Sequence, residues 1–287
     1  MIKNNFLLLQ IKKIFKIMKN KNILCGAFFL TILFFFVCFR SFLNIPDPYV
    51  SSNSKPLQSI SSKHWLGTDE TGYDLFSRVL EGTKVSLRIS IITVIISSLI
   101  GSFLGLLAGY FRSFLDHIII FLCDLIIFFP DIIIAILIML MFTKQKAEHN
   151  LIIILTIAYI PSYIRIIRAN TLTIKQKDFV KASKALGAND MQIIKRHILP
   201  NILSNLITKI ILNISSVILA ISSLGFIGLG LDRSIAEWGN ILYSSKNYIL
   251  NYPHLFYGPF IIIFCTIFSL NLIGKGLISY FEKNSNN

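Results

Sequence analysis

Long apolar runs constrain this chain more than any other feature. Six of them, each nearly free of charged residues, lie at approximately 23–39, 85–110, 118–142, 151–167, 202–231 and 255–280. A bilayer core of about 30 Å is crossed by roughly 20 apolar residues in a helix. The composition agrees, because 54% of the residues are hydrophobic, 15% are charged and the mean hydropathy is +0.69. The sequence therefore predicts an all-α integral membrane protein with six transmembrane helices.

The first run resembles the core of a cleaved signal peptide, because lysines precede it. However, it is long for a signal core, and the residues from Arg40 to Asn44 lack a small-x-small cleavage motif. We therefore expect a retained helix. The expected organisation is a basic tail (1–22), a first span (23–43), an extracytoplasmic loop (44–84), a membrane core (85–280) that contains a cytoplasmic loop (169–201), and a short tail (281–287).

The net charge of +14 is distributed unevenly along the chain. Basic residues gather before the first run, between Arg165 and Lys209, and near the C-terminus. An excess of Lys and Arg in alternate loops is the positive-inside pattern, which places both termini and the 169–201 loop in the cytoplasm. Membrane lipid and the membrane potential account for this charge, so we expect no nucleic-acid partner.

Residues that would indicate enzyme chemistry are sparse. The four cysteines lie inside apolar runs, where they act as small hydrophobes, and the five histidines are scattered without ligand spacing. No GxxxxGK[ST] phosphate loop is present; Gly274-Lys275-Gly276 lacks its other members. We expect no catalytic site, metal or cofactor, so any ATP chemistry belongs to another chain.

A basic segment with helical signals lies between two apolar runs, at residues 181–201. Gly187 predicts the end of one helix, and Asn189 with Gln192 has the form of a capping box that starts another. The second helix is expected to stop at Leu199, because a residue before proline disfavours the α region, and Pro200 suits the first turn of the next span. A segment lying on lipid headgroups would explain the lysines equally well.

The order Ala182, Gly187, Ile193, Leu199-Pro200 resembles the cytoplasmic EAA loop of permease subunits of binding-protein-dependent ABC importers. Within that group it looks most like the dipeptide, oligopeptide and nickel importers. The resemblance implies the type I importer fold and a coupling helix that docks in a groove of the ATPase subunit. The implied coupling residues are Ala182, Ser183, Gly187, Ile193, His197, Leu199 and Pro200.

Other motifs follow in the order typical of the same family, over about residues 63–277. They are His64 to Asp74, Ala108-Gly109-Tyr110, Asp124 with Pro130, Leu224 to Gly230, Trp238-Gly239 and Asn271 to Gly274. Together they resemble the second, C-type permease of the pair. The sequence departs from the family pattern at Tyr73, Phe121, Lys181, Ser183 and Ile221, which affects the family's charge pairs and substrate preference.

Polar groups inside the apolar runs are few. Asp124 is interpreted as a structural ion pair with Arg165 or Arg168, or alternatively as a gate. Asp131 lies two helical turns further on, and we assign it no role.

Glycines form a second set of candidates. Gly101, Gly105 and Gly109 form overlapping GxxxG units that predict close helix packing, and Gly225 and Gly228 are expected to pack helices or loosen the end of a span. Gly67 and Gly72 predict a turn that caps a short separate helix at 75–80.

The resemblance implies a transmembrane subunit that imports short peptides across the bacterial inner membrane. Its implied partners are a second homologous permease, two ABC ATPases and an extracytoplasmic substrate-binding protein, besides membrane lipid. In this interpretation the 181–201 segment is a rigid handle that moves the fourth and fifth spans. The alternatives are an importer of nickel complexes or another small solute, a self-sufficient secondary transporter, and an integral-membrane enzyme.

Overall fold

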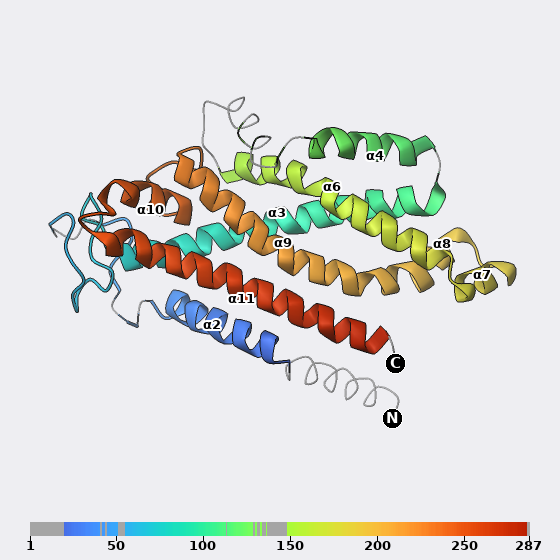
Figure 1. Ribbon diagram of the computed structural model, residues 1–287, viewed down its shortest axis with the longest axis horizontal. Helices are drawn as coiled ribbons and strands as arrows, with labels where there is room; N and C mark the ends of the chain where they lie inside the picture. Colours follow the sequence, from blue (N-terminus) through green and yellow to red (C-terminus); the bar gives the residue numbers. More distant parts are fainter. Residues whose placement is uncertain are drawn as a thin grey trace. The chain divides into compact units, whose positions relative to one another are not determined.

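The computed structural model describes residues 20–40, 42–43, 45–50, 55–112, 114–128, 130, 133, 136 and 148–285. Within these residues the regular structure is helical (Figure 1). The helices are α2 (Lys21–Cys38), α3 (Leu75–Phe111), α4 (Phe114–Ile127), α6 (Glu148–Lys175), α7 (Asp178–Ala185), α8 (Asp190–Ile193), a π-helical turn (Ile194–Ile198), α9 (Leu199–Ile227), α10 (Trp238–Ser245), a 3-10 turn (Lys246–Tyr248) and α11 (Pro253–Ser285).

Five of the six predicted spans are represented by helices long and apolar enough to cross a membrane. They are α2, α3, α6, the run from α8 through α9, and α11. The third predicted run, 118–142, begins in α4, but most of its remainder lies outside the described residues, and so does Asp131. α6 is longer than the predicted run 151–167, because it continues through residues 169–175 of the predicted loop.

The chain divides into two compact units, one formed by residues 1–90 with 211–287 and the other by 91–210. In the first unit α2 lies along α11 (Figure 1). Their backbones approach closely at Gly26, where a Cβ atom would lie 2.5 Å from the carbonyl oxygen of Ser269. Small residues at such positions let helices associate by direct van der Waals contact.

The separate short helix predicted at 75–80 is wrong, because α3 is continuous from Leu75. The predicted turn is confirmed: Gly67 and Gly72 have φ of +77° and +82°. Asp74 starts the helix by accepting a hydrogen bond from the Ser77 amide (2.7 Å), and its other carboxylate oxygen lies 2.8 Å from Nδ1 of the buried His64. A single internal glycine, Gly82, does not break the helix, since tertiary contacts outweigh its modest propensity cost.

Trp238 explains why a glycine lies at position 82. A Cβ atom there would lie 2.9 Å from Cδ1 of the indole, which is fully buried. The indole Nε1 donates to the Val79 carbonyl at 3.1 Å. Trp238 therefore fastens the start of α10 to α3.

Glu237, which precedes Trp238, is a fully buried carboxylate that caps α10. It accepts hydrogen bonds from the amides of Gly239 (2.9 Å) and Asn240 (3.1 Å) and from the hydroxyl of Ser86 (3.1 Å). Gly225 of α9 packs on the same turn, because its Cβ would lie 2.8 Å from Cα of Gly239. The structure thus places Gly225 in a helix contact, while Gly228, with φ of +91°, follows the end of α9.

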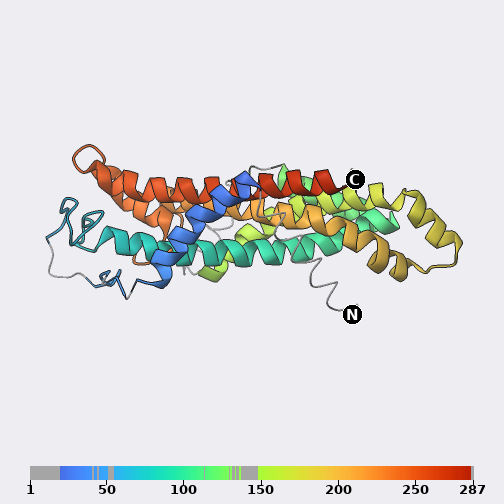
Figure 2. The ribbon, with the colours of Figure 1, turned by 90° about the horizontal axis from the view of Figure 1, so that it is seen from below.

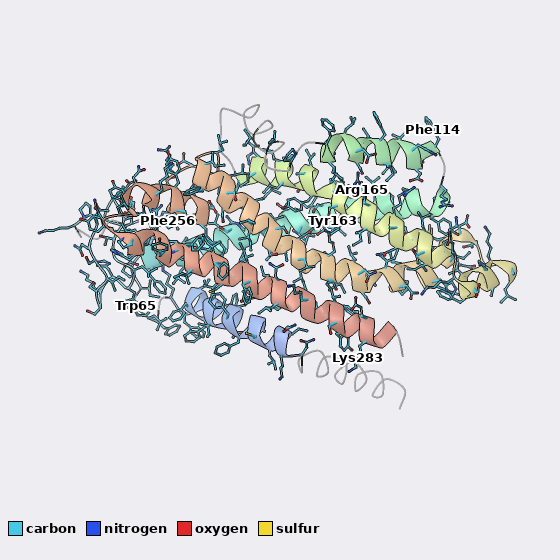
Figure 3. All side chains as sticks on the ribbon, in the orientation of Figure 1. Trp65, Phe114, Tyr163, Arg165, Phe256 and Lys283 are labelled. Carbon is cyan, nitrogen blue, oxygen red and sulfur yellow. The ribbon has the colours of Figure 1, made fainter. Side chains whose placement is uncertain are left out.

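In the second unit α3 and α6 pack through the predicted glycine row. A Cβ at Gly101 would lie 2.5 Å from Cβ of Tyr163, which Figure 3 labels on α6. The corresponding atom at Gly105 would lie 2.6 Å from the carbonyl oxygen of Ile164. At Gly109 it would lie 2.8 Å from the carbonyl oxygen of Arg168. The obstacles are mostly backbone atoms, so any side chain at these positions forces the two helices apart.

Two ion pairs join α4 to α6. Arg165, labelled in Figure 3, lies 2.5 Å from Oδ1 of Asp124, and both side chains are about half exposed. Arg168 instead forms a two-pronged pair with Asp116 at 2.6 and 2.7 Å. Of the two partners considered for Asp124, the structure therefore places Arg165 beside it. Arg168 instead contacts Asp116, which was not among the residues singled out in the sequence.

Candidate coupling surface

Helices α7 and α8 form a short hairpin at one end of the second unit (Figure 2). α7 ends in a Schellman motif: the Gly187 amide donates to the Lys184 carbonyl at 3.0 Å and the Ala188 amide donates to the Ser183 carbonyl at 3.1 Å. Gly187 has φ of +86°, in the left-handed region that suits glycine. The predicted helix end at Gly187 is confirmed.

The predicted capping box at the start of α8 is also confirmed. The Gln192 amide donates to Oδ1 of Asn189 at 2.8 Å, and the Asn189 amide donates to Oε1 of Gln192 at 3.0 Å. Both bonds satisfy amides that have no acceptor within the helix. The chain therefore turns from α7 into α8 through a connection defined by backbone geometry on both sides.

The helix end expected at Leu199 is wrong. Leu199 has α-helical dihedrals (φ −56°, ψ −47°), and the run from Asp190 to Ile227 is one continuous helix. The π-helical turn Ile194–Ile198 accommodates Pro200: the Leu199 amide donates five residues back, to the Ile194 carbonyl. Widening the helix by one residue there relieves the clash that a proline ring makes with the preceding turn.

An apolar cluster holds the hairpin against the ends of the longer helices. Val180, Ile193 and Ile198 are buried and pack with residues of α3, α6 and α9, among them Ile174 and Ile202. Met191, by contrast, is exposed. The buried pair is Ile193 and Ile198, five residues apart, because the π turn changes the period. This anchoring makes the hairpin a firmly attached element.

The outward side of the hairpin exposes apolar side chains. Leu186 is 88% exposed, Met191 59% and Phe179 44%. Phe179 also packs near His197, with ring centroids 5.8 Å apart.

The remaining implied coupling residues are distributed around this surface. Ala182 is exposed on α7, Ser183 is half-buried and contributes its carbonyl to the Schellman motif, and Leu199 and Pro200 are exposed at the start of α9. Lys181, Lys184 and Lys195 of the same hairpin are also exposed. The hairpin therefore exposes both apolar and positively charged side chains.

Comparison with known proteins agrees with the family resemblance of the sequence. Residues 101–286 match the family described as binding-protein-dependent transport system inner membrane component. The glutathione transport system permease protein GsiD of Pectobacterium atrosepticum is 39% identical over 217 residues, which is 76% of this chain and 71% of that protein. The dipeptide transport system permease protein DppC of Alkalihalophilus pseudofirmus is 32% identical over 259 residues, which is 90% of this chain and 84% of that protein.

The fold is also found among solved structures. The crystal structure of an amino acid ABC transporter with histidines matches with a TM-score of 0.56 at 19% sequence identity. The match covers 73% of this chain and 94% of that chain. Most of the chain matches the family model, and permeases more than 30% identical to it align over three quarters or more of its length. The chain therefore belongs to the family of inner membrane components of binding-protein-dependent transport systems, as a transmembrane subunit and not an ATPase subunit.

Proposed function

We propose that this chain is one of two permease subunits of an ATP-driven importer for short peptides. The similarity to permeases named for glutathione and for dipeptides supports this substrate class. In this proposal a second homologous permease forms the other half of the path, and an extracytoplasmic binding protein delivers the peptide. Two ATPase subunits supply the energy, and the chain itself breaks no covalent bond.

The α7–α8 hairpin carries the proposal, because it has the properties of a docking element. Its core is anchored by buried isoleucines, whereas Phe179, Leu186 and Met191 remain exposed. A partner groove would bury these side chains, and each large apolar side chain removed from water contributes about 1.5–3 kcal/mol. The exposed lysines of the hairpin favour an acidic partner surface, which would increase the association rate.

The hairpin is continuous with two long helices, which gives the docking a mechanical consequence. Only residues 176 and 177 separate α6 from α7, and α8 runs into α9 without a break. A displacement of the hairpin is therefore passed to the cytoplasmic ends of α6 and α9. In the proposed cycle, closure of the ATPase subunits moves the hairpin and switches the path between inward-facing and outward-facing states.

Gly187→Val tests the docking, because the structure isolates its effect. A Cβ atom at Gly187 meets nothing within 4 Å, so the substitution causes no clash inside the chain. The cost is the left-handed backbone alone, about 1–2 kcal/mol for a residue with a Cβ. We expect normal insertion and pairing with the partner permease, but loss of ATPase co-purification and of peptide uptake. Gly187→Asn is the matched control, since asparagine tolerates this conformation.

Ala182→Asp gives an independent test by placing an unpaired charge in the docking surface, and we expect the same losses. A hairpin that lies on anionic lipid instead requires its lysines and tolerates Gly187→Val. Wild-type coupling in Gly187→Val, with loss only after reversal of Lys181, Lys184 and Lys195 to glutamate, would exclude docking. Ion-driven peptide uptake by the chain alone in liposomes would contradict the importer subunit altogether.

A further inference from the structure

We infer that Tyr110 links the α7–α8 hairpin to α3. Movement of the hairpin that is driven by the ATPase subunits is then transmitted to α3 as well as to α6 and α9. The inference rests on the proposed function. The Tyr110 hydroxyl donates a hydrogen bond to Oδ1 of Asp190 at 2.7 Å, across 80 residues of sequence. Tyr110 lies at the C-terminal end of α3, and Asp190 is the first residue of α8.

The surroundings hold the phenol in place for this bond. Tyr110 is only 4% exposed, and its ring belongs to the apolar cluster that includes Ile174 of α6 and Ile193 of α8. Lys175, the last residue of α6, places Nζ 4.7 Å from the centroid of the same ring and donates to the Tyr110 backbone carbonyl. The ends of α3, α6 and α8 therefore meet at one side chain.

The hydrogen bond between Tyr110 and Asp190 links α3 to the hairpin, which the backbone does not do directly. The hairpin is joined to α6 and α9 through the backbone, whereas α3 is followed by α4 and has no direct connection to α7 or α8. A hydrogen bond to a carboxylate is stronger and more directional than an apolar contact. Asp190 lies within the capping box, between Asn189 and Gln192, so its backbone has a defined position in the hairpin. Tyr110 and Asp190 are thus positioning residues that make α3 follow the hairpin.

The test uses the complete importer, with both permeases, the ATPases and the binding protein, in proteoliposomes. Tyr110→Phe removes the hydroxyl and keeps the ring, and Asp190→Ala removes the acceptor. Tyr257→Phe is the matched control, because Tyr257 is an exposed tyrosine on α11. Two quantities are measured: binding-protein-stimulated ATP hydrolysis, and the number of peptides taken up per ATP hydrolysed.

We expect Tyr110→Phe and Asp190→Ala to retain ATPase docking and stimulated hydrolysis. The uptake per ATP should fall by about fivefold or more, the lower end of typical coupling between sites. The double variant should be no worse than either single variant, because both remove the same bond. Asp190→Asn keeps a carbonyl acceptor for the phenol and should restore most of the coupling.

Three outcomes would overturn the inference. The first is an uptake per ATP in Tyr110→Phe equal to that of wild type and Tyr257→Phe. The second is independent, multiplying losses in the double variant. The third is loss of ATPase docking in Tyr110→Phe, which would make Tyr110 a support of the docking surface and not a link to α3. Each of these leaves the proposed function intact, whereas ion-driven peptide uptake by the chain alone, without any ATPase, would contradict that function itself.

Discussion

The buried carboxyl of Glu237 predicts that this protein becomes less stable as the pH rises toward neutrality. Burial raises the pKa of Glu237 from 4.5 to about 7, although the Gly239 and Asn240 amides and the Ser86 hydroxyl act in the opposite direction. Glu237 lies between α9 and α10, outside the helices that cross the membrane. The perturbation is Glu237→Gln, which keeps an oxygen acceptor for the capping amides and removes the titration.

The sign follows from proton linkage. The folded state binds the proton of Glu237 more tightly than the unfolded state does. The contribution of this protonated carboxyl to folding stability is therefore fully present below pH 4.5 and is lost as the pH rises to about 7. At 1.36 kcal/mol per pKa unit, the loss in folding free energy amounts to about 3 kcal/mol. For a chain of this size, that corresponds to a difference in Tm of about 5–10 °C.

Thermal unfolding of the purified permease in detergent, from pH 4.5 to 8, measures this effect directly. The Tm of the wild type should fall with rising pH relative to that of Glu237→Gln, so subtracting the two curves removes the contribution of every other group. Glu237→Ala should be less stable at every pH, because two amides and a hydroxyl lose their acceptor at about 1–3 kcal/mol each. Identical pH slopes in wild type and Glu237→Gln would refute the assignment of a raised pKa to this carboxyl.

Two further predictions concern packing and orientation. Gly105→Leu should lower the Tm by several degrees, because a Cβ atom at this position would lie 2.6 Å from the backbone of Ile164 and overpacking costs about 1–3 kcal/mol. Ile96→Leu, at an exposed position of α3, is the control. Equal Tm values for the two variants would contradict the close contact between α3 and α6. In a cysteine-free background, an impermeant thiol reagent applied outside cells should label Ser244→Cys and not Ser183→Cys, whereas labelling of Ser183→Cys would contradict a cytoplasmic hairpin.

Features that depend on neighbouring residues could be predicted from the sequence alone. The apolar runs predicted the membrane class because lipid requires about 20 consecutive apolar residues regardless of what the helices contact. The helix end at Gly187 and the capping box of Asn189 and Gln192 are bonds between residues three to five apart, so their signal is contained in a short window. The family could also be predicted from the sequence, because it depends on the order of short motifs along the chain.

Only the tertiary structure decided how distant parts of the chain meet. One local feature was also missed: a π turn keeps Leu199 helical before Pro200, which the general rule for prolines does not anticipate. Arg168 pairs with Asp116 and Tyr110 bonds to Asp190, 52 and 80 residues away. Glu237 is an ordinary loop glutamate in the sequence, and burial against α3 and α9 raises its pKa to about 7. Each partner in these contacts has an unremarkable residue type, and its role arises from the neighbour that folding brings to it.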